Sequence, residues 1–572
     1  MNNKLEGNHI EEMSGGKIAV ESLKSKKVKD VFGLIGSATI EMFDALYDEE
    51  NINFIGVRDE RTGTHMADGY ARATGQPGVI IAGQNGPGAT NLVTGLAQAA
   101  AAFSPVVSIA GAPPSNSVID NEFQKLDQQA LFKPVTKKVW TIDKTEQISE
   151  IFHEAFCEAI TPKCGPVHLN LPRNILSTSI KFNDFQTSQS LNSQKYSFAS
   201  ENEITKAIEI IRDAKCPVII AGGGIKNNGR YTEVLELAKT LNSPIVTSAG
   251  HGDAIPFDNQ LNAGQMGPRG NPIATRLTKE ADVILALGTR LGFNSTFYSY
   301  ENINQKASII QVELDSKAIG NYFPVKLGIC ADAPTVAQQI NNMILKMKKI
   351  TEVNDWTNQF IQERISFLKN RDEEALSLNE NQLIQPTGIF KELRDILPRN
   401  AAITLDAGTL CLQATDALNY WEPPCLFTPL DFGLVGFSFA CGLGIKVAQP
   451  DRPVVSLMGD GGFGMTISEL STAVQYSINT VTIVMNNQCW GAEKAYQRDF
   501  FGKRFIGSDI NSPPFDKVAE LYGAKGFNVK KISELKDAVE AALKCNKPAV
   551  INVAVDPSAL YSFRRDSFKP QK

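Results

Sequence analysis

Short apolar runs recur along the chain, separated by glycine-rich turns and by stretches in which apolar residues return every three or four positions. Near the C-terminal end, Pro453 to Met458 and Thr480 to Met485 are two such runs, both rich in β-branched residues. Runs of this length and composition are typical of buried strands. Between them, Thr466 to Glu469 has the sequence of a capping box and predicts the start of an amphipathic helix. The segment is therefore predicted to form strand, turn, helix and strand.

The same alternation occurs in two earlier parts of the chain and predicts three doubly wound parallel-sheet α/β domains. We place them at residues 1–185, 186–349 and 350–572. In the central domain the pattern predicts a helix and three strands, at 204–212, 217–221, 281–288 and 309–313. A charged stretch, about 350–381, is predicted as a helical connector to the third domain.

Composition is that of an ordinary globular protein. The 572 residues are 42% hydrophobic and 21% charged, and the net charge of −5 gives no sign of nucleic-acid binding. The nine cysteines contain no CxxC pair, which favours reduced thiols over disulfides or zinc. No long apolar span and no signal-peptide pattern are present, so we expect a cytoplasmic protein without membrane contact.

A carboxylate and an amide follow the two C-terminal apolar runs. Asp460 stands in the turn Gly459-Asp460-Gly461-Gly462, and Asn487 follows the second run. The carboxyl ends of neighbouring parallel strands meet at one edge of a sheet, so these side chains are expected to lie close together. Hard oxygen ligands of this kind suit Mg²⁺, and a diphosphate would supply further oxygens. The pattern predicts a metal and diphosphate site.

Residues 459–464 also satisfy GxGxxG, the dinucleotide fingerprint. A nicotinamide site requires an acid on the ribose about 20 residues further on. That place holds Met485-Asn486-Asn487, and Asp460 would face the pyrophosphate without a cation between them. A dinucleotide site is therefore disfavoured, while a glycine turn without a ligand remains the plainer alternative.

The metal motif resembles that of thiamine diphosphate enzymes, and the N-terminal third resembles the pyrimidine-binding domain of the acetolactate synthase-like members. Four segments carry that second resemblance: 31–36, 53–61, 65–72 and 83–91. The resemblance implies thiamine diphosphate and Mg²⁺ as cofactors, with Asp460, Asn487 and Cys489 at the metal. It also implies a homodimer or homotetramer whose active sites combine the pyrimidine end of one subunit with the diphosphate end of another.

By position in this family, Glu60 is the catalytic carboxylate that binds the aminopyrimidine of the cofactor. A carboxyl group on the ring nitrogen favours the tautomer basic enough to take the proton from the reactive carbon. Taken alone, Glu60 could instead pair with Arg58 or Arg61 on a solvated loop.

The resemblance implies further cofactor contacts in the third domain. Gly408 and Thr409 follow a predicted strand where relatives bind diphosphate oxygens. In the segment Gly433-Leu-Val435-Gly436, Val435 is the candidate for the apolar residue beneath the thiazolium, although an ordinary core valine is the alternative. Gly461 and Gly462 complete the predicted cofactor set.

The reaction is indicated by three shorter segments, 328–332, 488–500 and 563–566, which resemble the sulfoacetaldehyde acetyltransferases. That activity converts sulfoacetaldehyde and phosphate to acetyl phosphate and sulfite. Because both substrates are anions, fixed cations near the thiazolium would favour binding. The candidate substrate residues are Gln84, Gln124, Trp490, Glu493, Lys494, Arg564 and Arg565.

Acetolactate synthase, which condenses two pyruvates, is the alternative activity. It would place FAD on the central domain, but 264–270 lacks the expected Met-His-Gly, so FAD is uncertain and not expected. Arg290 could still touch a nucleotide. A related aldehyde or 2-oxo acid could use the same scaffold, whereas a silent binding subunit is disfavoured because Glu60, Asp460 and Asn487 are all present.

Overall fold

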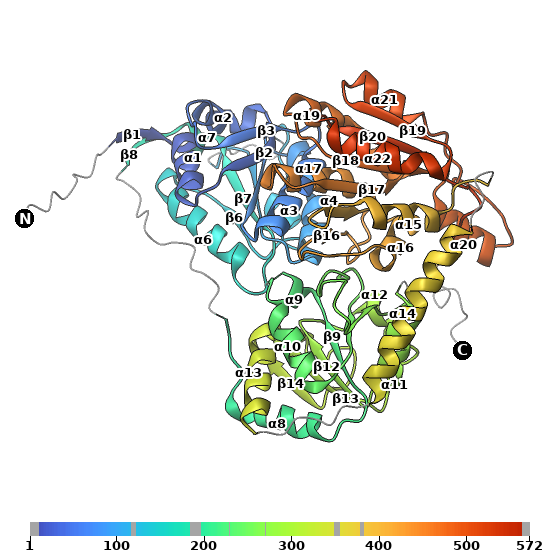
Figure 1. The fold of residues 1–572 in the computed structure, drawn as a ribbon. Coiled ribbons are helices and arrows are strands. Elements are labelled where there is room, and N and C mark those ends of the chain that lie inside the picture. The colour runs from blue at the N-terminus through green and yellow to red at the C-terminus, as the bar shows by residue number, and fades with distance from the viewer. Residues whose placement is uncertain are drawn as a thin grey trace, which may run out of the picture. The chain divides into compact units, whose positions relative to one another are not determined.

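The computed structural model describes residues 11–115, 122–182, 196–227, 229–268, 270–347, 355–377 and 382–562. Within these residues the chain forms three six-stranded sheets in which every strand pair is parallel (Figure 1). The predicted α/β class with three parallel-sheet domains is confirmed. Arg564 and Arg565 lie outside the described residues.

The first sheet has the strand order β3-β2-β4-β5-β7-β6. Its strands are β2 (Asp30–Leu34), β3 (Asn53–Gly56), β4 (Gly78–Ala82), β5 (Val106–Ala112), β6 (Val139–Thr141) and β7 (Val167–Pro172). Its helices are α1 (Gly15–Ser25), α2 (Ile40–Tyr47), α3 (Glu60–Thr74), α4 (Pro87–Ala101), α5 (Gln128–Phe132), α6 (Ile148–Ile160) and α7 (Arg173–Ser177). A separate antiparallel pair joins β1 (Glu11–Ser14) to β8 (Ser179–Phe182). These elements belong to one compact unit, which also includes residues 443–450 and 468–478.

The second sheet has the order β11-β10-β9-β12-β13-β14. Its strands are β9 (Pro217–Ala221), β10 (Ile245–Thr247), β11 (Asn262–Gln265), β12 (Val283–Leu287), β13 (Ser308–Glu313) and β14 (Leu327–Cys330). Its helices are α8 (Glu201–Arg212), α9 (Gly223–Lys226), α10 (Tyr231–Leu241), α11 (Pro272–Glu280), α12 (Phe293–Thr296) and α13 (Ala333–Lys346). The helix and the three strands predicted here are confirmed to within a few residues.

Both faces of this sheet are covered, because successive strand residues point to opposite sides. Ile219 and Ala221 of β9 pack in a cluster with α8, α10 and α13. Val218 and Ile220 pack on the other face, with α11 and the connector helix α14 (Asp355–Leu376). In Figure 1 the two groups of helices flank the strands accordingly.

The third sheet has the order β16-β15-β17-β18-β20-β19. Its strands are β15 (Ala402–Leu405), β16 (Leu426–Phe427), β17 (Val454–Gly459), β18 (Val481–Asn486), β19 (Lys525–Val529) and β20 (Ala549–Ala554). The helices in this part of the chain are α15 (Pro386–Ile396), α16 (Thr409–Ala417), α17 (Ser438–Ala448), α18 (Asp460–Thr466), α19 (Leu470–Gln475), α20 (Gly491–Phe500), α21 (Phe515–Leu521) and α22 (Leu535–Lys544). Of these, α19 and the C-terminal part of α17 fall in the residues that belong to the first unit.

The helix after β17 differs from the prediction. It begins at Asp460, directly behind the extended residue Gly459, and Thr466 is its last residue. The predicted capping box does not form, because the buried Thr466 hydroxyl has no hydrogen-bond partner among the described residues. Glu469 instead accepts hydrogen bonds from the Thr62 hydroxyl and from the Arg58 N–H. Among the described helices, none is long and apolar enough to cross a membrane.

Candidate active site

The predicted metal residues come together at the carboxyl edge of the third sheet. Strands β17 and β18 are parallel neighbours, with Gly459 paired to Met485. Asp460 and Asn487 therefore leave the sheet side by side, and both side chains are buried. This confirms the predicted arrangement of two strands with a carboxylate and an amide at their ends.

Three oxygen atoms can converge at this place. One of the two atoms of the Asn487 side-chain amide group points toward Asp460. This atom lies 3.3 Å from Asp460 Oδ1 and 3.0 Å from the Cys489 carbonyl oxygen. If this atom is the amide nitrogen, it donates to both acceptors; if it is the oxygen, three oxygens face one another and require a cation. The residues present therefore fit a hard divalent metal such as Mg²⁺.

Cys489 would contribute its carbonyl oxygen rather than its sulfur. Burial is the main cause that raises the pKa of the Cys489 thiol, to about 11, so the side chain is protonated at neutral pH. A protonated thiol is a poor metal ligand, because the thiolate is the form that binds. The carbonyl is held in place by an antiparallel bridge between Cys489 and Asp509.

Burial also raises the pKa of Asp460, although hydrogen bonds oppose the shift. Ser512 donates one of these bonds to Asp460 Oδ2 over 2.6 Å, and the Gly461 and Gln488 N–H groups supply others. A desolvated carboxylate whose pKa is raised would gain from a cation beside it.

Other predicted residues surround the same point. Gly461 lies beneath the Trp490 indole, because a Cβ there would be 2.5 Å from the ring. Gly491 lies between the Asn487 amide and the Thr409 hydroxyl, at 3.2 and 3.8 Å from the position of its missing Cβ. The start of α16, where Gly408 is the N-cap residue, is thus close to the metal residues, as a diphosphate site requires. Trp490 thus packs on the turn at residues 459–462, here called the metal turn.

Asp406, at the end of β15, holds the loop that carries Val435. Its carboxylate accepts hydrogen bonds from the N–H groups of Gly436 and Phe437, both at 2.9 Å. Burial raises the pKa of Asp406 to about 6 against these bonds. Val435 is only half-buried within its unit, which is unlike an ordinary core valine, and the left-handed residue Gly433 has open space around it.

Glu60 is the first residue of α3 and is buried, with 4% of its surface exposed. The Asn91 amide donates to Glu60 Oε2 over 3.0 Å, and a Cβ on Gly88 would lie 3.1 Å from Glu60 Oε1. Burial is the largest cause that raises the pKa of Glu60, and the Asn91 bond opposes it. This buried position is not that of a solvated loop, and it fits a carboxyl group that exchanges a proton with a ring nitrogen.

The segments of Gln84 and Gln124 lie near Glu60. A Cβ on Gly88 would be 3.2 Å from Gln84 Cβ, and one on Gly86 would be 2.8 Å from the Gln124 carbonyl oxygen. Gln84 donates to the Ser37 hydroxyl over 3.1 Å. Both predicted substrate residues thus lie in the neighbourhood of the predicted catalytic acid.

A buried polar network behind the Gly86 turn was missed by sequence reasoning. Gln128 accepts from the Gly86 N–H at 3.3 Å and donates to Asn170 Oδ1 at 2.6 Å. That oxygen lies 3.0 Å from His168 Nε2, and the Ser108 hydroxyl lies 2.8 Å from His168 Nδ1. Burial lowers the pKa of His168 to about 3, so the ring is neutral. The isolated residues gave no spacing signal in the sequence.

The predicted substrate cation Lys494 forms an ion pair with Asp509, and its Nζ lies over the Phe505 ring. The neighbour Glu493, which could have neutralised it, is exposed, and the carboxylate that Lys494 pairs with is that of Asp509. Arg290, the possible nucleotide contact, pairs with Asp431 at 3.3 Å. Both cations therefore have carboxylate partners in the chain.

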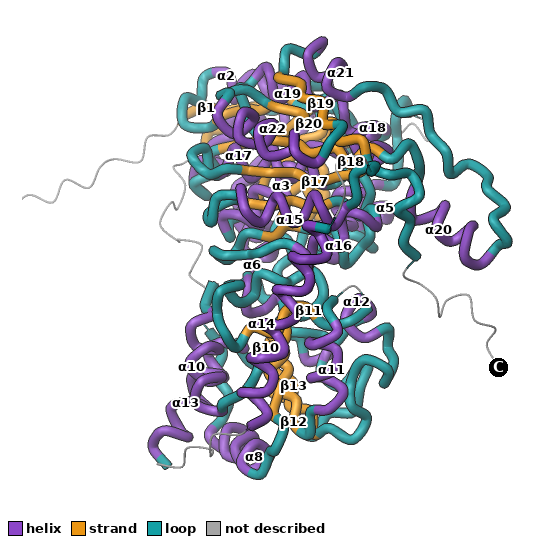
Figure 2. Tube along the Cα trace, turned by 45° about the vertical axis from the view of Figure 1, so that its right-hand side comes forward, coloured by secondary structure: helices purple, strands orange, loops and turns teal. Residues whose placement is uncertain are grey.

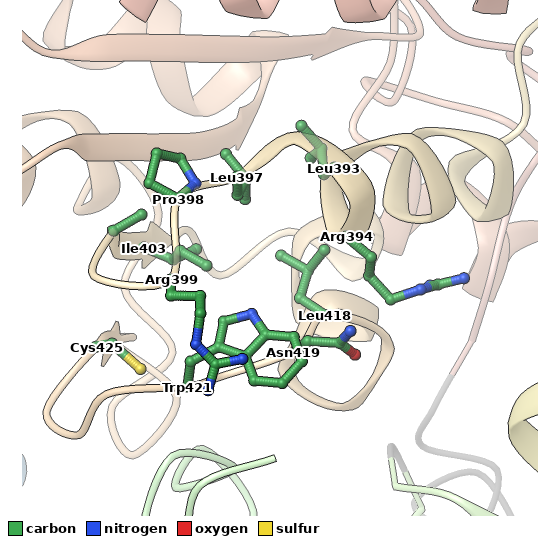
Figure 3. A pocket seen from close by; sticks show the side chains of 11 residues that line it. Leu393, Arg394, Leu397, Pro398, Arg399, Ile403, Leu418, Asn419, Trp421 and Cys425 are labelled. Atoms are coloured by element: carbon green, nitrogen blue, oxygen red, sulfur yellow. The ribbon is translucent and has the colours of Figure 1, made fainter. Parts of the chain in front are cut away.

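A small cavity lies away from these residues (Figure 3). It is bounded by residues that precede or begin β15 and β16, including Ala401, Ile403 and Cys425. Its volume is about 10 Å³, room for at most one water molecule. Because Asp406 leaves the opposite end of β15, this cavity belongs to neither the metal nor the diphosphate site.

Comparison with known proteins decides the family. Sequence models of one family match three parts of the chain: the N-terminal TPP binding domain of thiamine pyrophosphate enzymes at residues 13–131, the central domain at 204–340 and the C-terminal TPP binding domain at 406–553. The chain belongs to the thiamine pyrophosphate enzymes. Thiamine pyrophosphate is another name for thiamine diphosphate, so the predicted family and cofactor class are confirmed.

Relatives of two activities are equally similar to this thiamine pyrophosphate enzyme. A sulfoacetaldehyde acetyltransferase of Castellaniella defragrans is 32% identical, covering 98% of this chain and 96% of its own. A probable acetolactate synthase large subunit of Methanococcus aeolicus is 33% identical, covering 96% and 93%. The acetolactate synthase isozyme 3 large subunit of Escherichia coli K12 is 30% identical, covering 96% of each chain. The family is shown, and the substrate is not decided by similarity.

Proposed function

We propose that this thiamine diphosphate enzyme is a sulfoacetaldehyde acetyltransferase that uses Mg²⁺. The observation that carries the proposal is the position of segment 488–500, one of those that resemble such transferases. It begins beside the metal residues, with Trp490 on Gly461 and Gly491 between Asn487 and Thr409. Residues that vary with the activity are expected at the reacting end of a cofactor site.

A second resembling segment contributes less. Residues 328–330 belong to the edge strand β14, and Asp332 caps α13 while pairing with Arg230. These are contacts that stabilise the central domain. The third, 563–566, lies outside the described residues. The proposal therefore depends chiefly on the segment beside the metal.

Bound thiamine diphosphate supplies the nucleophilic carbon and the electron sink for acyl transfer. In the proposed reaction the aldehyde carbon becomes the acyl carbon, the carbon–sulfur bond breaks with its electron pair leaving on sulfite, and phosphate takes the acetyl group. The overall change needs no external oxidant. Glu60 would hold the aminopyrimidine in its basic tautomer, and Val435 would support the thiazolium.

Asp460, Asn487 and the Cys489 carbonyl would hold Mg²⁺ against the diphosphate, whose oxygens would meet the start of α16 at Gly408 and Thr409. Because the family divides each active site between subunits, we propose a homodimer or homotetramer as the active form. We also propose the cytoplasm as its location.

The test is to incubate the purified protein with thiamine diphosphate, Mg²⁺ and phosphate, and to supply sulfoacetaldehyde or pyruvate separately. Sulfite and acetyl phosphate formed in equal amounts, and lost in Glu60→Gln, would support the transferase. Acetolactate from pyruvate would instead support the second candidate, which the equal similarity of acetolactate synthases favours. EDTA should abolish either activity and Mg²⁺ should restore it.

A further inference from the structure

Residues 488–512, here called the α20 segment, leave the third sheet and return to it at the same place. In Figure 2, α20 lies out to one side of the strands, joined to them by long loops. The two ends of the segment are paired: Trp490 N–H donates to the Ser508 carbonyl over 2.7 Å, and Ile510 N–H donates to the Gln488 carbonyl over 3.0 Å. The segment is therefore closed at its base, beside Asn487.

The side chain of Gln488 adds a second connection across this base. Gln488 Oε1 accepts from the Ser512 N–H at 3.1 Å, while its Nε2 donates to Asn486 Oδ1 at 2.8 Å. Gln488 also has a φ of +59°, a left-handed conformation that is uncommon for a residue other than glycine. The end of β18 thus fixes the position of Ser512.

From this position the Ser512 hydroxyl donates to Asp460 Oδ2 over 2.6 Å. The other oxygen of the same carboxylate, Oδ1, lies 3.3 Å from the Asn487 amide, and that amide lies 3.0 Å from the Cys489 carbonyl oxygen. A carboxylate can rotate about its bond to Cβ, and a hydrogen bond to one oxygen restricts which oxygen is presented to a metal.

We propose that Ser512 is a positioning residue for the metal site, which orients the Asp460 carboxylate so that Oδ1 is presented to the divalent ion. The residue comes from the far end of the α20 segment, 52 positions from Asp460. The closed base of the segment is then a condition for tight metal binding. This inference rests on the proposed metal site.

The α20 segment offers a matched control. Ser508 takes part in the backbone pairing at the base of the segment and is buried. Its hydroxyl forms no hydrogen bond within the described part of the chain. Ser508→Ala removes one oxygen from the same segment without touching Asp460. Ser512→Thr keeps the hydroxyl and tests whether the hydrogen bond itself is required.

The experiment measures Mn²⁺ binding to the full-length protein with saturating thiamine diphosphate, by the free-Mn²⁺ signal in electron paramagnetic resonance. Ser512→Ala should weaken Mn²⁺ affinity about 10- to 100-fold, as is usual when a partner of a ligand is removed. Ser508→Ala should stay near wild type, and Ser512→Thr should recover most of the loss. The metal concentration for half-maximal activity should rise in Ser512→Ala, with kcat largely restored at saturating metal.

The outcomes separate the two proposals. Wild-type protein that binds no Mn²⁺ would overturn the metal site itself. Wild-type binding that Ser512→Ala leaves unchanged, or that Ser508→Ala weakens equally, would overturn the role of Ser512 while leaving the metal site in place. Thermal unfolding of each variant without metal shows whether a loss of affinity reflects a loss of folded protein.

Discussion

Gly462 lies so close to Asp406 that a Cβ on this glycine would be 2.1 Å from the Asp406 Oδ2 atom. The same Cβ would be 3.4 Å from Val435 Cγ1. One glycine thus brings together the end of β15, the loop beneath the predicted thiazolium position and the metal turn. Because Asp406 also accepts a hydrogen bond from the Gly436 N–H, the three segments pack directly against one another.

Gly462→Ala should therefore disturb the packing of these three segments. The added methyl group must displace the buried Asp406 carboxylate, at a cost of about 1–3 kcal/mol in the free energy of unfolding, and thiamine diphosphate affinity should fall. Gly464→Ala is the control, since open space surrounds Gly464; it should leave binding unchanged. Urea unfolding and cofactor titration measure both effects. Equal behaviour of the two variants would contradict the close packing.

The metal turn shows what the sequence could predict. The two apolar runs, with Asp460 and Asn487 behind them, predicted neighbouring parallel strands with their polar residues at one edge, because such patterns are local. The hydrogen bonds made by Asp406, by Ser512 and within the His168 network were not predicted. Each acts on a residue 30 or more positions away in the chain, such as Gly436 or Asp460, and no periodicity indicates such a partner.

The predicted capping box at the start of the helix after β17 was wrong for a related reason. Thr466 and Glu469 have the sequence of a capping box, but tertiary contacts override this local preference. The Thr472 hydroxyl donates to Glu469 Oε2 over 2.6 Å, and Glu469 also accepts from the Arg58 N–H. A buried carboxylate takes the donors that the fold brings to it, which local pattern cannot show.

Glu60→Gln should abolish most activity without unfolding the protein. Glutamine is isosteric and can still bind Asn91, but it cannot exchange a proton with the aminopyrimidine, so kcat should fall about 10²- to 10⁴-fold. Asp59→Asn is the control, because asparagine can keep the cap on Arg61 N–H while removing the adjacent charge. Steady-state kinetics and thermal unfolding are the measurements. An Asp59→Asn variant as inactive as Glu60→Gln would argue against a special role for Glu60.

His168 should make the folded protein sensitive to acid. Burial lowers its pKa from 6.5 to about 3 in the folded state, so below pH 6.5 the unfolded chain binds a proton that the folded protein does not. The contribution of neutral His168 to the free energy of unfolding is fully present above pH 6.5. It is lost as the pH falls toward 3, by up to about 1.4 kcal/mol per pH unit.

His168→Gln removes this titration, and its urea midpoint should fall less than that of wild type between pH 7 and pH 5. His65, whose pKa burial also lowers to about 3, contributes equally to both proteins and cancels in the comparison. Parallel pH profiles for the two proteins would show that His168 does not carry the effect.

The ion pair of Lys494 and Asp509 leads to a prediction about anionic substrates. Asp509 is 70% exposed, so it can be replaced with little effect on packing, and its loss would leave the Lys494 charge uncompensated near the metal turn. If the proposed substrate is correct, Asp509→Asn should lower the KM for sulfoacetaldehyde about 2- to 5-fold at low salt, the range expected for one exposed charge, and the gain should shrink as salt is added. Lys494→Met should raise the same KM.

The control is Asp499→Asn, an acid of the same segment that pairs with Arg498 instead. If all three variants keep the wild-type KM at low salt, Lys494 takes no part in binding the substrate, and the anion site must be sought elsewhere.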